Sequence, residues 1–313
     1  MSFLEKNIEH SVLSDNVSVE KVIGCPRVSV VVPTYYDWDR LQKCIDALSK
    51  QSFPQDQFEV IIVNNALDDV VPANLLLSEN VSLIKEGKPG SYAARNAALK
   101  IAQGDILAFT DSDCIPDPFW LESAVARLEQ GAELVAGKIE LFFKTDKLTI
   151  VEIYEKAFAF DQEKYVTVGG SATANMVTWS RHFETVGHFN DALMSGGDVE
   201  WGRRANEKGI VIEYASEVIV NHPARSDIKA MLKKKRRLLG GEINKNKQSS
   251  KNNFILTLIK GCLPPRKALK LFLQKDLTFK EKLLAYLLCY FLKVYSTVYR
   301  LALLLGLAKP KRS

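Results

Sequence analysis

The sequence has 313 residues, 47% of them hydrophobic, which suits one large α/β domain with an appendage. Residues 1–224 contain 20 Lys and Arg against 33 Asp and Glu, whereas residues 225–313 contain 22 against 4. This asymmetry predicts an anionic partner for the basic tail, either nucleic acid or an anionic membrane surface. The five cysteines show neither zinc-site spacing nor a disulfide framework, which favours a reducing cytosol. Acidic and polar residues near the N-terminus argue against a secretory signal there.

Strands and helices are predicted to alternate after an N-terminal extension of residues 1–26. Apolar, β-branched runs indicate buried strands at 27–37 (RVSVVVPTYYD), 58–65 (FEVIIVNN), 81–87 (VSLIKEG) and 105–113 (DILAFTDSD). Helical spacing lies between them, at 41–51 (LQKCIDALSKQ) and 90–105 (GSYAARNAALKIAQGD). This order predicts a mostly parallel, Rossmann-like sheet between two layers of helices, a doubly wound α/β fold.

The second half of the body is less regular. A helical stretch at 118–131 precedes a strand-like run at 133–143, and small residues follow at 168–179, where the backbone could approach a ligand closely. Gly196 and Gly197 form a turn before a helix that is predicted to begin at Asp198. The segment VIVNHPAR closes the body with an apolar strand that ends in polar residues.

Polar segments follow several of these strands, at the sheet edge where doubly wound folds bind ligands. The segments are Thr34 and Tyr35, Asn64 and Asn65, Lys88 to Arg95, and Asp111 to Asp113. Two carboxylates directly after a buried strand repel each other, which suggests a cation that binds both Asp111 and Asp113. Asp37 and Asp39 have the same spacing but precede a helical pattern, where Asp39 is the expected N-cap.

At this point the sequence resembles a known family. The segments VVPTYYDWDRLQKCIDALSKQSFP, VIIVNNALDD, GSYAARNAAL, ILAFTDSDCIPDP and GGDVEWGRR are similar, in the same order, to the motifs of family 2 glycosyltransferases with the GT-A fold. The resemblance covers roughly residues 27–224. It implies an inverting enzyme that uses a nucleoside-diphosphate sugar and a divalent metal, Mn²⁺ or Mg²⁺.

The resemblance also implies roles for individual residues. Asp113 is the implied metal ligand, with Asp111 as a nucleotide contact that shares the metal, and Asp198 is the implied general base. His222 is a further implied metal or diphosphate contact. The implied contacts of the donor nucleotide are Pro33, Thr34, Tyr35, Asn64, Lys88, Arg95 and Asp111.

Purely structural roles stay open for the same residues. Asp111 and Asp113 could cap the helix that follows them, and Asp198 could cap the helix that starts at Val199. Arg95 could lie on a helix surface, and His222 could be a hydrogen-bonded residue at a strand end. Glu200 and Arg204 are spaced for an ion pair on one helix. His10, His182 and His188 show no metal-ligand spacing.

Two positions depart from the family pattern. Gly197 stands where the family has a Glu before the catalytic Asp, so the support of Asp198 is in question. Asn64 stands where the family usually has an Asp that accepts a hydrogen bond from uracil. An amide has both a donor and an acceptor and can still pair with a pyrimidine edge. The departure leaves the base open: UDP leads, and GDP and dTDP stay as alternatives.

The basic tail, residues 225–313, is predicted to be helical. It contains KKKRR within residues 226–250, and Lys282, Lys293 and Arg300 recur on one stripe of a later apolar helix. No charge-free run there reaches the roughly 18 residues of a spanning helix. We therefore expect the tail to lie on an anionic membrane surface; an oligomer-forming or core-packed helix and a true span are alternatives. Nucleic-acid binding is not expected, because no base-reading motif is present.

Taken together, these patterns predict a cytoplasmic glycosyltransferase, of the hexosyltransferase type, peripheral at the inner face of the cell membrane. Its predicted acceptor is a hydroxyl of a lipid-linked molecule or a polysaccharide, an expectation that depends on the tail and on the resemblance. One alternative is a haloacid-dehalogenase-type phosphatase in which Asp111 attacks phosphorus and Asp113 is the acid/base. Another is a non-catalytic subunit that binds nucleotide sugars or glycans, which the missing Glu at position 197 would suit.

Overall fold

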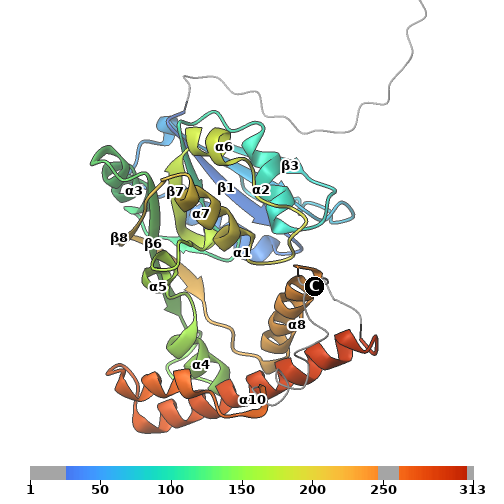
Figure 1. The fold of residues 1–313 in the computed structure, drawn as a ribbon. Coiled ribbons are helices and arrows are strands. Elements are labelled where there is room, and N and C mark those ends of the chain that lie inside the picture. Colours follow the sequence, from blue (N-terminus) through green and yellow to red (C-terminus); the bar gives the residue numbers. More distant parts are fainter. Residues whose placement is uncertain (1–25, 246–260, 309–313) are drawn as a thin grey trace, which may run out of the picture.

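The structure is a computed structural model that describes residues 26–245 and 261–308. The predicted N-terminal extension therefore lies outside the described residues, apart from its last position. Figure 1 shows a sheet body with helices on both sides and a separate helical layer that contains α10. The sheet strands are β1 (Val28–Thr34), β2 (Phe58–Asn64), β3 (Val81–Lys85), β4 (Ile106–Phe109), β5 (Ile115–Pro116), β6 (Leu134–Phe142), β7 (Met176–Trp179) and β8 (Ile212–Pro223).

The eight strands form one sheet in the order β3-β2-β1-β4-β7-β6-β8-β5. The first four are parallel, as the alternation of strands and helices predicts. β7 is antiparallel to both β4 and β6, whereas β6 and β8 are parallel to each other. The sheet is therefore mixed in its second half, which the less regular sequence there did not reveal.

Helices cover both faces because the buried strands are apolar on both faces. The α-helices of the body are α1 (Trp38–Leu48), α2 (Ser91–Leu99), α3 (Trp120–Glu129), α4 (Ile150–Phe158), α5 (Gln162–Val166), α6 (Arg181–Val186) and α7 (Gly197–Glu207). Alternate residues of β1 divide between two hydrophobic clusters. Val30 and Val32 pack in the cluster that contains α1 and α3, whereas Val31 packs in the cluster that contains α2, α6 and α7. Short 3-10 turns lie at η1 (Gln55–Gln57) and η2 (Thr173–Asn175).

Helix α1 differs from the expectation at its start. It begins at Trp38, so Asp37 precedes it and Asp39 lies in its first turn. The side chain of Asp37 makes no capping bond. It accepts hydrogen bonds from Arg40 Nε at 2.6 Å and Ser112 Oγ at 3.3 Å, which joins it to the loop of the aspartate pair. The prediction that Asp39 is the N-cap was wrong, because Asp37 is the residue that precedes the helix.

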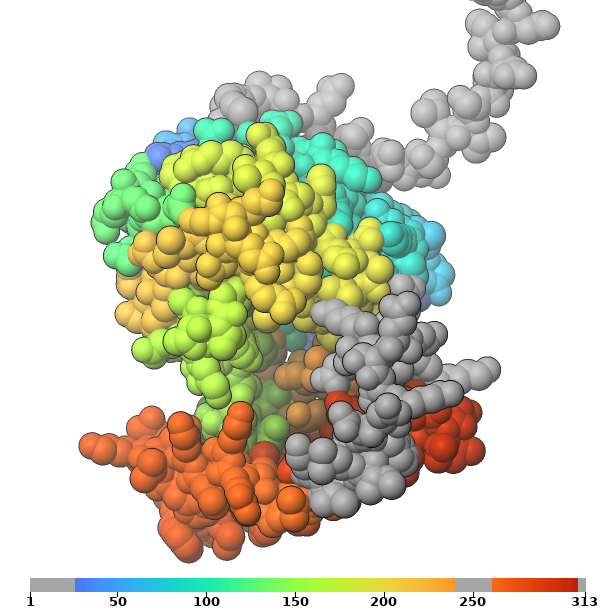
Figure 2. Space-filling model, viewed as in Figure 1, coloured from blue at the N-terminus to red at the C-terminus, as the bar shows by residue number. Residues whose placement is uncertain are grey.

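The tail contains α8 (Ile228–Lys245), η3 (Arg266–Leu273) and α10 (Phe279–Leu304). A cluster of Val151, Met231, Leu288 and Leu292 joins α4, α8 and α10. A second cluster joins α4 and α10 to η3 and to Leu277. Figure 2 shows the surface of η3 and α10, orange to red, at the end of the molecule away from the sheet body. The predicted boundary between the body and the tail at residue 225 stays a prediction, because α4 of the body packs directly on the tail.

Among the described residues, α10 is the one helix long and apolar enough to cross a membrane, by length and composition alone. Its most apolar 18-residue window has a mean hydropathy of 1.4, and 11% of that window is buried. The helix also contains Lys282, Lys293 and Arg300, so it holds no uncharged run of that length. Lys282 Nζ donates to Phe272 O at 3.3 Å and Lys293 Nζ to Leu263 O at 2.7 Å. Two of the three stripe cations therefore bind backbone carbonyls of the preceding segment.

Candidate active site

The ends of β1 and β2 lie side by side at the predicted ligand edge. Thr34 pairs in register with Asn64, and both side chains are buried. Asn64 Oδ1 accepts a hydrogen bond from Ala66 N at 2.9 Å, which identifies Nδ2 as the free donor of the amide. Within the part of the chain that the structure describes, Asn64 Nδ2 and Thr34 Oγ1 have no hydrogen-bond partner. Because buried polar atoms are normally paired, these two atoms indicate a polar ligand at this edge.

The aspartate pair follows β4 in a tight turn, in which Cys114 N donates to Asp111 O at 3.0 Å. Asp113 lies 3.1 Å from Arg40 Nη1, and Asp111 forms an ion pair with Arg95. The Arg95 side chain is only 3% exposed, so the alternative of a helix-surface arginine was wrong. Its Nε has no partner among the described residues. The pair thus lies between two arginines and does not cap the helix that follows.

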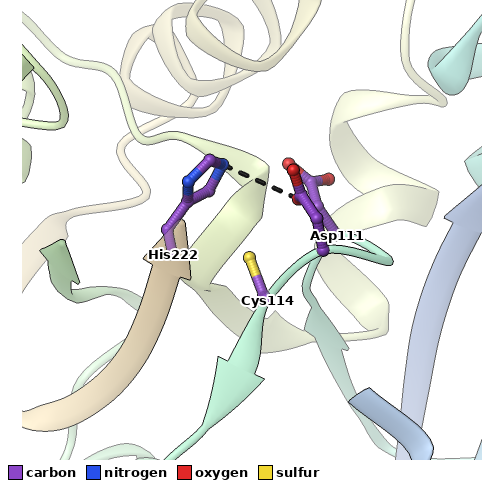
Figure 3. A group of neighbouring side chains, drawn as sticks. Asp111, Cys114 and His222 are labelled. Atoms are coloured by element: carbon purple, nitrogen blue, oxygen red, sulfur yellow. Dashed lines mark ion pairs between the residues drawn. The ribbon is translucent and has the colours of Figure 1, made fainter. Parts of the chain in front are cut away.

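Strand β8 brings His222 to the same turn. The short strand β5, which follows the aspartates, pairs with β8 through Ile115 and Asn221. His222 Nε2 consequently lies 3.7 Å from Asp113 Oδ1. His222 Nδ1 lies 2.9 Å from Pro223 O, which can only accept a hydrogen bond, so Nδ1 is the donor and Nε2 is the ring nitrogen that faces Asp113. Figure 3 shows His222, Cys114 and Asp111 turned toward one another.

These side chains fit a divalent metal. Ligand atoms of Asp111, Asp113, Cys114 and His222 all lie within 4.8 Å of one another. Carboxylate oxygens and one imidazole suit Mn²⁺, whereas Mg²⁺ prefers oxygen alone. Burial raises the pKa of the Cys114 thiol well above its usual value, and a soft sulfur ligand suits zinc or copper better than Mn²⁺ or Mg²⁺. The fitting donor set is therefore Asp111, Asp113 and His222.

Asp198 lies in the first turn of α7 and is held by a neighbouring helix. Its Oδ1 accepts a hydrogen bond from the Tyr92 hydroxyl at 3.0 Å and another from Val199 N at 3.0 Å. Burial raises the pKa of Tyr92, which keeps this hydroxyl a donor. The predicted start of the helix is off by one residue, because α7 begins at Gly197 and Gly196 precedes it in the left-handed conformation.

Tyr92 also explains the glycine at position 197. A Cβ added to Gly197 would lie 2.7 Å from Tyr92 Cε2, closer than real Cβ contacts. The Tyr92 ring thus occupies the space that a Glu at this position would need. Its hydroxyl contacts Asp198 directly, so the departure from the family motif leaves Asp198 with a hydrogen-bond partner.

Helix α2 connects the two halves of the site, because Tyr92 contacts Asp198 and Arg95 contacts Asp111. The α2 helix has Gly90 before it, as predicted, at a φ of 125°. Asn65 fixes the loop before α2 by accepting a bond from Gly90 N and donating to Lys88 O at 2.8 Å. The sequence reading included Arg95 in the site but missed Tyr92, although both lie in the segment GSYAARN.

The other predicted residues have mixed positions. Pro33 is buried at the end of β1, and Tyr35 is 52% exposed and packs edge-on against Tyr36. Lys88 is exposed and pairs with Asp191 at 2.7 Å, so the structure does not bring it to the aspartate cluster. Arg40, which the sequence reading also missed, could have been suspected only from its spacing to Asp37.

Glu200 and Arg204 form the ion pair that their spacing predicts, at 2.8 Å. Arg204 also donates to Val186 O at 2.6 Å and His188 O at 2.8 Å. These bonds hold the loop before α7 in place. The pair therefore has a structural role that is sufficient to explain both residues.

Comparison with known proteins identifies the family of the chain. The family described as glycosyl transferase family 2 matches residues 29–183. Glycosyltransferase AglE from Haloferax volcanii is 35% identical over 225 residues, which are 70% of this chain and 73% of AglE. The chain therefore belongs to glycosyltransferase family 2 and is a transferase enzyme. This membership disfavours the phosphatase alternative.

More distant relatives show the breadth of the family. The poly(ribitol-phosphate) β-N-acetylglucosaminyltransferase TarS from Staphylococcus aureus is 32% identical over 109 residues, 33% of this chain and 19% of TarS. A solved mannosyltransferase from Pyrobaculum calidifontis, in complex with GDP-mannose and Mn²⁺, has a TM-score of 0.53 at 18% identity. The match covers 91% of this chain and 76% of that one. This likeness shows that the fold is of the GT-A type.

Proposed function

We propose that the chain is an inverting glycosyltransferase that moves a sugar from a nucleoside-diphosphate sugar to a hydroxyl of a lipid-linked or polysaccharide acceptor. The observation that carries this proposal is the cluster of Asp111, Asp113 and His222 beside unpaired polar atoms of Thr34 and Asn64. Donor-binding contacts of Pro33, Tyr35 and Lys88 remain part of the proposal. UDP is the favoured nucleotide, and the GDP-sugar of the solved mannosyltransferase makes GDP the first competitor.

Asp113 and His222 would hold Mn²⁺, with Asp111 as a shared ligand. When bound, the metal would neutralise the diphosphate that leaves the sugar. Asn64 Nδ2 offers a hydrogen bond to a carbonyl of the base, and Arg95 adds positive charge next to Asp111. Asp198 would accept the proton of the acceptor hydroxyl as that oxygen attacks the anomeric carbon. Tyr92 would keep the Asp198 carboxylate in one orientation.

The donor site is tested by calorimetry with UDP, GDP and dTDP, each with and without Mn²⁺. We expect metal-dependent binding of one nucleotide, and at least a tenfold weaker Kd in Asp113→Ala, because the charge of the diphosphate is then left uncompensated. Asp146→Ala, a change of the same kind at an exposed position, serves as the control. Binding of none of the three nucleotides would contradict the proposed donor site.

The general base is tested separately with Asp198→Asn. We expect sugar transfer to fall by about 10²–10⁴-fold, because the amide cannot accept the proton, while nucleotide binding stays unchanged. Turnover at the wild-type rate would show that Asp198 is not the base. Loss of nucleotide binding would instead place Asp198 in the donor site.

We also propose that the protein is cytoplasmic and lies on the inner face of the membrane through η3 and α10. Exposed apolar side chains continue across both elements, among them Leu269, Leu273, Leu283, Leu287 and Phe291. Exposed cations lie in and near the same elements, namely Arg266, Lys267, Lys270, Lys275 and Lys280. The opposite face of α10 packs on α4 and α8, which favours a helix that lies on the lipid over one surrounded by it.

A further inference from the structure

A basic pocket opens beside the candidate metal ligands Asp113 and His222 and extends along α8. It has a volume of about 580 Å³ and shares Arg40, Asp113 and His222 with the candidate active site. The rest of its lining comes from Lys144, from residues 223–227 at and after the end of β8, and from one face of α8, formed by Ala230, Lys233, Lys234 and Arg237. From Ala230 to Arg237 this face runs about 10 Å. In Figure 1, α8 lies between the sheet body and α10.

Positive charge on the α8 side exceeds what the surrounding carboxylates can balance. Buried Glu155 pairs with Arg225 at 3.1 Å and with Lys234 at 3.4 Å. Burial lowers the pKa of Lys234 to about 8, so it stays mainly protonated at neutral pH. The Asp227 side chain, which also lines the pocket, accepts a hydrogen bond from Ala230 N at 3.1 Å.

Three further lining cations are exposed, namely Lys144, Lys233 and Arg237. Within the described ranges, none of them has an ion-pair partner. Three unpaired cations that line one pocket attract an anionic ligand, because convergent positive charge favours phosphate and carboxylate groups. A neutral sugar hydroxyl could accept hydrogen bonds from these cations, but an anionic group is attracted more strongly.

The pocket is distinct from the site proposed for the nucleobase of the donor. The unpaired atoms of Thr34 and Asn64 lie at the β1 and β2 end of the site, while the pocket begins at Asp113 and His222 and leads to α8. A donor that spans from the base site to the aspartates would have its diphosphate at the mouth of the pocket. The cations on α8 then line the far part of the pocket, which such a donor would leave open for a second ligand.

The packing of the other face of α8 favours an acceptor that is linked to a lipid. Ile228, Met231 and Leu232 pack with α10, whose outer side carries the exposed apolar stripe of Leu283, Leu287 and Phe291. An anionic group in the pocket is thus separated from this exposed apolar surface by α8 and α10, which pack on each other. We propose that the pocket on α8 binds the phosphate or diphosphate group of a lipid-linked acceptor. This inference rests on the proposed function and names its acceptor more closely.

The test measures binding of farnesyl phosphate, farnesol and inorganic phosphate to the full chain, with UDP or GDP plus Mn²⁺ measured in parallel. The variant is the double substitution Lys233→Gln and Arg237→Gln, at exposed side chains whose removal leaves the core intact. The matched control is Lys229→Gln with Lys235→Gln, which changes net charge equally but lies outside the pocket lining.

We expect farnesyl phosphate to bind the wild type, and the double variant to weaken it at least tenfold. The control variant and the nucleotide should change by less than twofold. Equal weakening of nucleotide and farnesyl phosphate would assign the pocket to the donor diphosphate and overturn the inference. Farnesol that binds as tightly as farnesyl phosphate would overturn the role of the charge, and inorganic phosphate that binds as tightly would overturn the lipid carrier. Intact nucleotide binding would leave the proposed donor site standing in each case.

Discussion

Tyr92 both binds Asp198 and packs against Gly197, the residue before it. The family motif that the sequence resembles has a Glu before the position of Asp198, the proposed general base; here a glycine stands in its place, and the Tyr92 ring fills the space. Substituting Gly197 alone would therefore force the ring away from α7. We expect any side chain at position 197 to move Tyr92 away from its hydrogen-bonding position at Asp198.

Tyr92→Phe removes the hydroxyl and keeps the ring. We expect kcat of sugar transfer to fall about tenfold, because Asp198 loses one of the bonds that orient it, while the Kd of the nucleotide stays the same. Steady-state kinetics together with calorimetry separate the two quantities. Tyr290→Phe, which removes a hydroxyl bonded to Cys262 O at 2.8 Å in the tail, is the matched control. An unchanged kcat in Tyr92→Phe would show that the bond has no positioning role.

At the scale of elements, α10 divides its faces between the protein and a proposed membrane. Ala285, Leu288 and Leu292 are buried against α4, α8 and η3, whereas Leu283, Leu287 and Phe291 are exposed. The cationic stripe predicted from the helical wheel is partly used within the protein, since Lys282 and Lys293 bind backbone carbonyls. The exposed cations proposed to face lipid headgroups are therefore those in and near η3, with Lys280 at the start of α10.

The double variant Leu283→Ser and Leu287→Ser should bind vesicles of anionic lipid about tenfold more weakly than the wild type. The physical reason is the loss of apolar area that would otherwise leave water at the interface. Co-sedimentation with vesicles measures this effect. Val211→Ser, at an exposed apolar residue just before β8, should leave binding unchanged. Equal binding by both variants and the wild type would rule out this face of α10 as the membrane contact.

At the scale of the whole molecule, Glu155 on α4 joins the sheet body to the tail. It is 1% exposed and pairs with Arg225, just before α8, and with Lys234 on α8. Burial alone would raise the pKa of Glu155, but Lys234 and Arg225 together hold it below its usual value. The ionised form is therefore the one that stabilises the fold.

Glu155→Gln should lower the free energy of unfolding by about 2–3 kcal/mol at pH 7, because two cations lose their carboxylate. Since the folded pKa is depressed, the stabilisation is present above the unfolded value of 4.5 and is lost as the pH falls through the folded pKa. Urea unfolding at pH 7 and pH 3 should show the difference between wild type and variant shrink at the lower pH. A difference independent of pH would contradict the role of the charge.

The sequence by itself determined the alternation of strands and helices, the ligand edge and most of the candidate residues, because these depend on local periodicity and on where each strand ends. Pro33, Thr34, Asn64, Arg95, Asp111, Asp113, Asp198 and His222 could all be named from strand ends and family motifs. The mixed order of the later strands could not, since β7 and β8 pair with partners far away in the chain.

Only the tertiary structure decided which side chains meet. Tyr92 reaches Asp198 across 106 positions of sequence and Arg40 reaches Asp113 across 73, so no local pattern could pair them. Likewise, the sequence of the basic tail shows a KKKRR segment and a cationic stripe on an apolar helix, but not which side of each helix is covered. Packing divides the tail into a face toward the proposed acceptor pocket, a face buried on α4 and an exposed apolar surface, because contacts between distant helices determine which side of each helix is covered.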